Sequence, residues 1–420
     1  MFTRKQADIL AGRINEPVNR LIVITGPRQI GKTTLVRRFL EQERSPAEYR
    51  YIALDEPVIP SPYDPMTAQN TLAMAGIRKP DIAWLTEQWE RARRASDDPD
   101  LQHGYILVLD EIQKIPQWSE AVKGLWDADR AVGRQLHIIL LGSAPLLMQQ
   151  GLTESLAGRF ELIRMSHWSF KEMNHAFGFE LSEYLYFGGY PGAAQYVRDQ
   201  YRWMDYVRSA LIEPNIEKDI LMMTRIDKPA LLKQLFELGC HYSGQELSLN
   251  KMKGKLENAG NETTLAGYLN LLTKAGLLTG LQKFANQQHR RRASPPKLNV
   301  LNTSLMTAMS GYSFEQAKGD RSYWGRLVES AVGAHLYNEG GPECRLYYWR
   351  DGHDEVDFIV ERGDKRVAIE VKSNPGVGSR RGLELFNERF KAHRTILVGD
   401  QGEPLEIFLS TDPIDWFAER

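Results

Sequence analysis

LIVITGPRQIGKTTL, which runs from Leu21 to Leu35, joins an apolar run to a glycine-rich loop. Its first four residues predict a strand that is buried on both faces of a parallel sheet. Residues 26–33 then match the pattern G-x-x-x-x-G-K-T, and residues 34–39 have a helical pattern. A strand, a glycine-rich loop and a helix in this order mark a phosphate-binding loop. We therefore predict an α/β P-loop NTPase fold built on a parallel sheet.

Each part of this loop can contribute to binding a nucleotide. Gly26 and Gly31 allow the backbone to curl so that successive N–H groups point at phosphate, and the following helix adds the positive end of its dipole. Lys32 would reach the β- and γ-phosphates, and the Thr33 hydroxyl would ligate Mg²⁺. The protein is thus predicted to bind a nucleoside triphosphate. The residues expected to surround it are Gly26, Pro27, Arg28, Gln29, Ile30, Gly31, Lys32, Thr33 and Thr34.

The composition narrows the classes of protein to be considered. Apolar residues make up 42% and charged residues 25% of the 420 residues, as in ordinary globular proteins with a hydrophobic core. This length indicates about three domains. Because the net charge is only −1, any contact with nucleic acid must come from local basic patches.

The number of cysteines and the lengths of the apolar runs indicate the cellular location to expect. Cys240 and Cys344 are too few for a disulfide framework or a zinc site. No apolar run approaches the length of a membrane span, and the first residues lack the apolar core of a signal peptide. We expect a cytoplasmic protein that does not contact a membrane.

A second apolar run, YILVLDEIQ from Tyr105 to Gln113, delivers two carboxylates at the end of a strand. Ligands bind at the carboxyl ends of the strands in open α/β sheets. Asp110 can hold Mg²⁺, directly or through water, and Glu111 can orient and deprotonate the attacking water. This pair therefore predicts ATPase-type chemistry rather than nucleotide binding alone.

Two further residues are candidates for the same site. Ser143 follows the apolar strand His137–Leu141 and would either sense the γ-phosphate or serve as the N-cap of the next helix. Arg159, in ESLAGRF, would stabilise transition-state charge, in cis or across a subunit boundary, or would be an ordinary surface charge.

A family resemblance rests on GPRQIGKTT, YIALDEP, DEIQKIPQW, LLGS, ESLAGRF and YFGGYPGA. Together these motifs resemble the prokaryotic AAA+-type ATPases with a DUF4143 C-terminal region, and they are similar to the archaeal ATPase and STAND-like group. The resemblance implies ATP and Mg²⁺ as cofactors, bound by Lys32 and Thr33. It also implies that Asp110 and Glu111 are the Walker B pair and Ser143 the sensor, although GSAPLLM here departs from a serine-rich run. The ATPase core is assigned to residues 1–165.

Two helical regions are expected after the core. Residues 166–225 are expected to form a small helical lid that covers the nucleotide. Residues 226–292 have the order of a winged helix, with the basic tip QQHRRR at 287–292. A recognition helix and a basic wing would suit a DNA groove and its phosphates, while a lid or a partner surface is the alternative interpretation.

The last region, residues 295–420, holds a second set of charged residues. Asp357 ends one predicted strand, and Glu370 and Lys372 lie on one face of the next. If Gly363–Asp364 forms a two-residue turn, Asp357 lies opposite Glu370. Facing carboxylates repel unless a cation lies between them, so this geometry favours a Mg²⁺ site, completed by Glu329 from a helix. Lys372 would polarise a phosphate or activate water without being a ligand.

This pattern resembles the PD-(D/E)XK nuclease fold, although the leading proline is absent. Three interpretations remain open for it. The region would be a metal-dependent phosphodiesterase, a restriction-endonuclease-like α/β fold used only for binding, or a simple surface charge pattern.

The whole sequence leads to two functional hypotheses. In the first, an Mg²⁺-dependent ATPase acts on double-stranded or branched DNA by remodelling or nucleotide-gated cleavage, as a monomer or a homo-oligomer. In the second, a STAND-like regulatory switch uses ATP to act on a protein partner, and its nuclease-like region is catalytically silent.

Overall fold

The computed structural model describes residues 2–54, 80–99, 101, 104–142, 151–152, 155–220, 226, 228–285, 294–372 and 380–418. Ser143 and the basic tip at 287–292 lie outside these residues. The chain divides into two compact units, one of Thr3–Met165 and one of Ser166–Arg420 with Met1–Phe2. Among the described helices, none has the length and apolarity that a membrane crossing requires.

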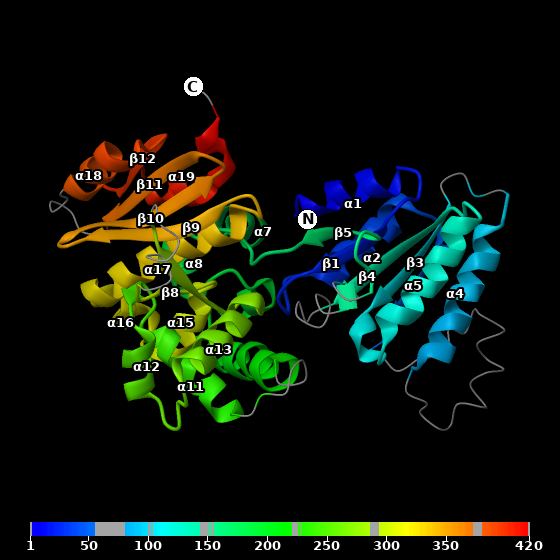
Figure 1. Cartoon of the computed structure of the whole chain (residues 1–420), viewed down its shortest axis with the longest axis horizontal. Helices are drawn as coiled ribbons and strands as arrows, with labels where there is room; N and C mark the ends of the chain where they lie inside the picture. Colours follow the sequence, from blue (N-terminus) through cyan, green and yellow to red (C-terminus); the bar gives the residue numbers. More distant parts are fainter. Residues whose placement is uncertain are drawn as a thin grey trace. The chain divides into compact units, whose positions relative to one another are not determined.

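The first unit is a five-stranded parallel sheet in the order β2-β3-β4-β1-β5 (Figure 1). This order puts the strand before the phosphate loop next to β4 and β5, with β3 one strand further away. The elements are α1 (Gln6–Ile14), β1 (Leu21–Thr25), α2 (Lys32–Glu43), β2 (Tyr49–Ala53), α4 (Ile82–Ser96), β3 (Tyr105–Asp110), α5 (Trp118–Ala131), β4 (Leu136–Gly142) and β5 (Phe160–Arg164).

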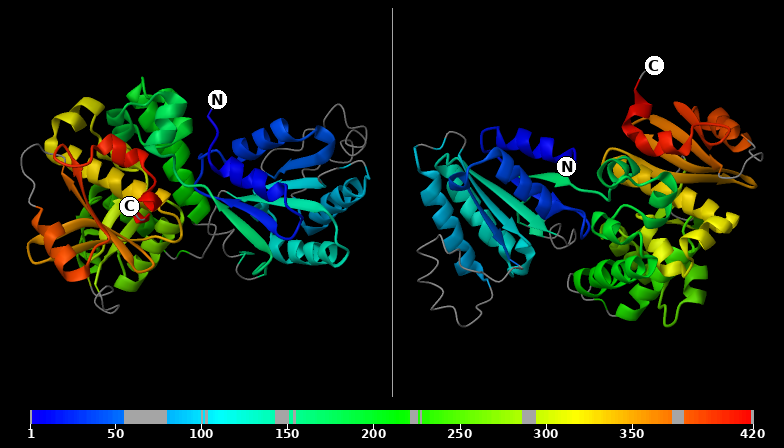
Figure 2. Two further views of the ribbon diagram at one scale, coloured as in Figure 1. Left: turned by 90° about the horizontal axis from the view of Figure 1, so that it is seen from above. Right: turned by 180° about the vertical axis from the view of Figure 1, so that it is seen from behind.

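The central strands of this sheet are covered on both faces, as expected from their apolar runs. Every residue of β1, β3 and β4 is buried. Alternate side chains such as Val23, Leu109 and Leu140 join one core with α4 and α5, and the views in Figure 2 show helices on both faces of the sheet. Burial on both faces leaves the strand ends as the part of the sheet that can hold a ligand.

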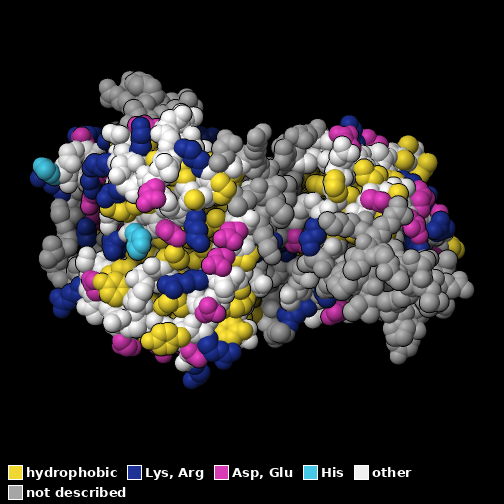
Figure 3. Space-filling model, turned by 90° about the horizontal axis from the view of Figure 1, so that it is seen from below, with side chains coloured by type: hydrophobic (Ala, Val, Ile, Leu, Met, Phe, Trp, Pro, Cys, Tyr) yellow, Lys and Arg dark blue, Asp and Glu magenta, His cyan; other side chains and the backbone are white. Residues whose placement is uncertain are grey.

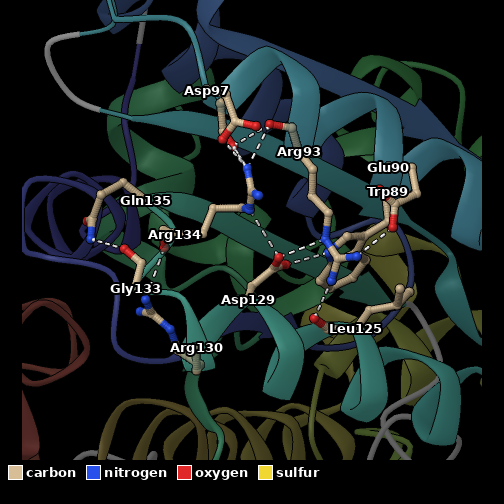
Figure 4. A network of polar contacts seen from close by, with 11 residues as sticks. Trp89, Glu90, Arg93, Asp97, Leu125, Asp129, Arg130, Gly133, Arg134 and Gln135 are labelled. Carbon is tan, nitrogen blue, oxygen red and sulfur yellow. Dashed lines mark hydrogen bonds and ion pairs between the residues drawn. The ribbon is translucent and has the colours of Figure 1, made fainter.

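A buried carboxylate ties α4 to α5 (Figure 4). Asp129, which is 3% exposed, accepts hydrogen bonds of 2.7 Å from the Trp89 indole N–H and from Arg93 Nε. Arg134 completes the pairing with an ion pair of 3.3 Å to the same carboxylate. Because the charge of Asp129 is compensated by two guanidinium groups, it can remain ionised inside the helical layer.

The second unit contains a seven-stranded mixed sheet in the order β12-β11-β10-β9-β7-β8-β6. Its strands are β6 (Gln245–Glu246), β7 (Leu278–Lys283), β8 (Lys297–Val300), β9 (Arg345–Asp351), β10 (Asp354–Arg362), β11 (Lys365–Lys372) and β12 (Arg394–Gly399). Its α-helices are α7 (Phe170–Phe177), α8 (Leu181–Phe187), α9 (Gln200–Tyr206), α11 (Pro229–His241), α12 (Leu249–Lys255), α13 (Glu262–Lys274), α15 (Thr303–Ser310), α16 (Phe314–Gly319), α17 (Arg321–Glu339), α18 (Arg381–Phe390) and α19 (Leu405–Ser410).

The expected regions 166–225, 226–292 and 295–420 belong to one compact unit in the structure. A single hydrophobic core includes Phe170 of α7, Leu232 of α11 and Phe358 of β10. The sheet also continues across the boundary that was expected between 292 and 295, because β7 pairs antiparallel with β8 and parallel with β9. Helices α7, α8 and α9, which lie in the region expected to form a lid over the nucleotide, pack into this shared core.

The hairpin register expected in the last region is confirmed. Strands β10 and β11 are antiparallel, with Arg362 opposite Lys365 and Phe358 opposite Ile369. Glu329 lies on a helix, α17, as expected. On the molecular face in Figure 3, Lys and Arg side chains are interspersed with Asp and Glu side chains, in keeping with the near-zero net charge.

Candidate functional site

The loop between β1 and α2 is shaped by close packing of its backbone. A side chain at Gly26 would bring its Cβ within 2.1 Å of the Met165 carbonyl oxygen, so only glycine fits there. Gly31, with φ of 93°, has the left-handed conformation directly before α2 begins at Lys32. These two positions turn the chain sharply from the strand into the helix, and the start of a helix after such a loop is a place where anions bind.

The Lys32 side chain is folded over this loop. Its ammonium group donates hydrogen bonds of 2.9 Å to the Gly26 carbonyl and 2.7 Å to the Pro27 carbonyl. Lys32 is only 6% exposed, so its charge is held at the loop and does not extend into solvent. A lysine in this position offers a point charge to a phosphate group bound by the same loop.

Thr33 and Asp110 meet at the ends of α2 and β3. The Thr33 hydroxyl donates a hydrogen bond of 2.7 Å to Oδ2 of Asp110, which is 3% exposed. The two residues are 77 positions apart in the sequence and are brought together by the parallel pairing of the central strands. A hydroxyl beside a carboxylate, both next to a phosphate loop, is the oxygen donor set that Mg²⁺ takes in nucleotide sites. The residues present therefore fit Mg²⁺ with ATP.

Tyr51 is a third member of this group, and sequence reasoning missed it. Its phenol on β2 donates a hydrogen bond to the same Asp110 oxygen. Burial, and after it the Asp110 carboxylate, raises the pKa of Tyr51, so the phenol keeps its proton and remains a donor. The Arg37 guanidinium lies over the Tyr51 ring, 4.7 Å from its centre. The only sequence signal is a tyrosine in the strand that precedes the LDEP motif.

Glu111 occupies an unusual backbone position. It follows β3 with φ of 59°, a left-handed conformation that costs a non-glycine residue about 1 kcal/mol or more. Its Oε2 accepts a hydrogen bond of 2.6 Å from Gln113 Nε2. The turn thus places a second carboxylate immediately after Asp110 at the end of the strand where the phosphate loop lies.

Arg159 is engaged elsewhere in the unit. Its guanidinium makes two hydrogen bonds, of 2.7 and 2.9 Å, with the two carboxylate oxygens of Asp127 on α5. The hydrogen bond from Arg159 lowers the pKa of Asp127. The structure thus pairs Arg159 with an acidic partner on a helix, whereas Thr33, Tyr51 and Asp110 form the connected group.

A second charged cluster lies inside the other unit, around a lysine that sequence reasoning also missed. The Lys297 ammonium on β8 forms ion pairs with Glu329 of α17 and, at 3.2 Å, with Oδ1 of Asp357 on β10. The other Asp357 oxygen, Oδ2, accepts a hydrogen bond of 2.8 Å from the Val371 backbone N–H. The cluster borders a cavity of about 280 Å³ that is also lined by Glu246, Tyr348, Arg350 and Glu355.

Glu370 on β11 has its own basic partner. Lys372 Nζ lies 2.5 Å from Glu370 Oε1, and the buried Oε2 has no hydrogen-bond partner among the described residues. Burial, and after it the charge of Asp357, raises the pKa of Glu370. Burial likewise raises the pKa of Glu329.

The magnesium site expected from Glu329, Asp357 and Glu370 does not fit this arrangement. Nowhere in the described ranges do three Asp, Glu, His or Cys residues form a group that could hold a metal ion. The cation between Glu329 and Asp357 is instead the Lys297 ammonium. No signal near Lys297 in the sequence links it to residues on a strand 60 positions away.

Comparisons with known proteins agree with the fold of the first unit. The family model of an AAA domain, AAA_14, matches residues 18–174. Two models of domains of unknown function match the rest, DUF8612 over residues 178–316 and DUF4143 over residues 324–412. The chain therefore carries an AAA domain with an α/β P-loop ATPase fold, followed by a DUF4143 region.

Two relatives and two solved structures illustrate what the chain is similar to. An uncharacterized protein of Mycobacterium tuberculosis is 27% identical over 96% of this chain and 83% of its own length. An uncharacterized protein of Haemophilus influenzae is 24% identical over 74% of this chain and 76% of its own length. Among solved structures, the Walker-type ATPase PABY2304 of Pyrococcus abyssi is 16% identical, with a TM-score of 0.47 over 74% of this chain and 96% of that one. The Aeropyrum pernix Orc1 protein in complex with DNA is 14% identical, with a TM-score of 0.29 over 74% of this chain and 92% of that one.

Proposed function

We propose that the first unit hydrolyses ATP with the help of Mg²⁺. The observation that carries this proposal is the hydrogen bond from Thr33 to Asp110 at the edge of the phosphate loop. When bound, Mg²⁺ would neutralise charge on the β- and γ-phosphates, with Thr33 and Asp110 as its protein ligands.

The chain's own residues would carry the other parts of the reaction. Lys32 exchanges its two carbonyl partners for phosphate oxygens, and the N–H groups at the start of α2 hold the phosphates in place. Glu111, directly after Asp110, orients the attacking water and accepts its proton. Tyr51 holds the Asp110 carboxylate through its phenol. Ser143 as a γ-phosphate sensor, and Arg159 as a transition-state group in cis or in trans, remain part of this proposal.

The test is Mg²⁺-dependent phosphate release by the full chain. Lys32→Ala is expected to lower kcat/KM roughly 100-fold or more, because the transferred phosphoryl group loses its contact with the positive charge of the Lys32 ammonium. Glu111→Gln is expected to retain ATP binding but to lower kcat by a similar factor. Lys171→Ala, which changes an exposed lysine of the other unit, serves as the control and is expected to hydrolyse ATP normally. ATP hydrolysis at the normal rate in Lys32→Ala would contradict the proposal.

We further infer that hydrolysis serves an action on DNA. The supporting observation is the order α11-β6-α12-α13-β7-β8, in which β8 pairs antiparallel with both β6 and β7, as in a winged helix. In this arrangement α13 would be the recognition helix. Exposed lysines at 251, 253 and 255 lie on α12, the helix directly before it, and would meet phosphates of a duplex.

The DNA proposal is tested by fluorescence anisotropy with linear and branched duplexes over a range of salt concentrations. Changing Lys251, Lys253 and Lys255 together to Gln is expected to flatten the slope of log K against log salt by about 0.9 for each phosphate that a lysine no longer neutralises. A control variant with three exposed basic residues of other helices changed to Gln is expected to keep the slope: Lys171, Lys318 and Arg321. If the wild-type chain neither binds DNA nor changes its ATPase rate with DNA, the function is a nucleotide-operated switch on a protein partner.

A further inference from the structure

We propose that the Lys297 ammonium is the resident cation of the carboxylate cluster in the second unit and takes the place of a divalent metal ion. The unit would then keep a nuclease-like arrangement of strands as a metal-free scaffold. This proposal concerns a part of the chain that ATP hydrolysis does not use, and it stands independently of that activity.

The first argument is the set of atoms around the ammonium. Its nitrogen lies 3.2 Å from Oδ1 of Asp357 and 3.3 Å from the backbone carbonyl oxygen of the same residue, and it forms an ion pair with Oε1 of Glu329. Two carboxylates and a carbonyl are the oxygen ligands that a hard divalent cation selects. The ammonium therefore sits at the point on which such ligands converge.

The second argument is that Lys297 is fixed in this position. It is the first residue of β8, where its backbone lies opposite Leu281 of β7 and Glu246 of β6. The residue is 6% exposed, and its ammonium also lies 4.9 Å from the centre of the Phe358 ring. Withdrawing the ammonium would leave the buried Asp357 and the partly buried Glu329 without their cation, at a cost of several kcal/mol.

The third argument is that each of these three carboxylates already has an ammonium partner. Glu329 and Asp357 share Lys297, while Glu370 is paired with Lys372 at 2.5 Å. Mg²⁺ binds oxygen ligands at about 2.0–2.1 Å, which leaves no room for the ammonium among the same oxygens. A divalent cation would have to expel Lys297 and would meet its repulsion in a region of low dielectric. The lysine thus selects against metal binding.

The experiment is Mn²⁺ binding to the nucleotide-free full chain, followed by electron paramagnetic resonance. Asp110→Asn is present in all samples so that the nucleotide site makes no contribution. We expect the chain with native Lys297 to bind no Mn²⁺ at the cluster, so that Asp357→Asn leaves its binding curve unchanged. Lys297→Ala is expected to gain one Mn²⁺ site at least tenfold tighter than any in its parent, and adding Asp357→Asn is expected to remove it.

A second variant guards against a failure of folding. Lys297→Met keeps the apolar stem of the side chain and removes only the charge, and circular dichroism checks that both variants remain folded. The proposal is overturned if the chain with native Lys297 binds Mn²⁺ in a way that Asp357→Asn weakens tenfold. It is equally overturned if a folded Lys297 variant gains no site, because the carboxylates then do not converge once the ammonium is gone.

Discussion

Replacing Tyr51 by phenylalanine removes one hydroxyl from the group around Asp110 and changes little else. The Tyr51 phenol and the Thr33 hydroxyl both donate to Oδ2 of Asp110. Because the carboxylate is 3% exposed, water cannot easily replace the lost donor. In Tyr51→Phe we expect the carboxylate to be held less firmly where Mg²⁺ and ATP would bind.

The size of the effect follows from the kind of hydrogen bond that is removed. A hydrogen bond to a charged group contributes about 1.5–3 kcal/mol. If all of this free energy stabilises the transition state, its loss lowers kcat/KM for ATP about 10- to 150-fold. The assay is steady-state phosphate release at several Mg²⁺ concentrations, and we expect the concentration of Mg²⁺ for half-maximal rate to rise as well. A residue that only stabilised the fold would not change this Mg²⁺ dependence.

Tyr49→Phe is the matched control for this experiment. Tyr49 lies on the same strand, two residues earlier, so its side chain points to the same face of the sheet. Its loss of a hydroxyl is expected to leave the ATPase rate and the Mg²⁺ dependence unchanged. The reasoning is refuted if Tyr51→Phe hydrolyses ATP like the wild type. The same holds if the two variants lose activity to the same extent.

Two further predictions concern the stability of the first unit. Asp129→Ala would leave the buried Trp89 N–H without its acceptor, while the Arg93 guanidinium would keep Glu90 and the Leu125 carbonyl as partners, so urea unfolding is expected to show a loss of about 1–3 kcal/mol; no measurable loss would contradict this account. His137 is 4% exposed, and burial lowers its pKa to about 4, so the unfolded chain takes up a proton that the folded chain does not as the pH falls below about 6.5. The free energy of unfolding should therefore fall by about 3 kcal/mol between pH 6.5 and pH 4 because of this residue, and His137→Leu should remove that part of the decline; parallel pH profiles for the two proteins would refute it.

The sequence by itself determined the features that depend on neighbouring residues. The apolar run before Gly26 and the glycine pattern after it predict a strand, loop and helix, and the structure has all three. The two-residue turn at Gly363–Asp364 likewise sets the register of β10 against β11, because a tight hairpin has only one pairing for a given turn. Such features are encoded locally, so a single sequence is enough to predict them.

Only the tertiary structure decided which distant side chains share a site. Tyr51 reaches Asp110 across 59 positions because β2 and β3 are neighbours in the sheet. Lys297 reaches Asp357 across 60 positions because β7 joins β8 to the strands that follow it. The sequence predicted a cation between the facing carboxylates Asp357 and Glu370, with Glu329 completing its site, because such carboxylates repel without one. That a lysine instead lies between Asp357 and Glu329 depends on strand order, which no local pattern encodes.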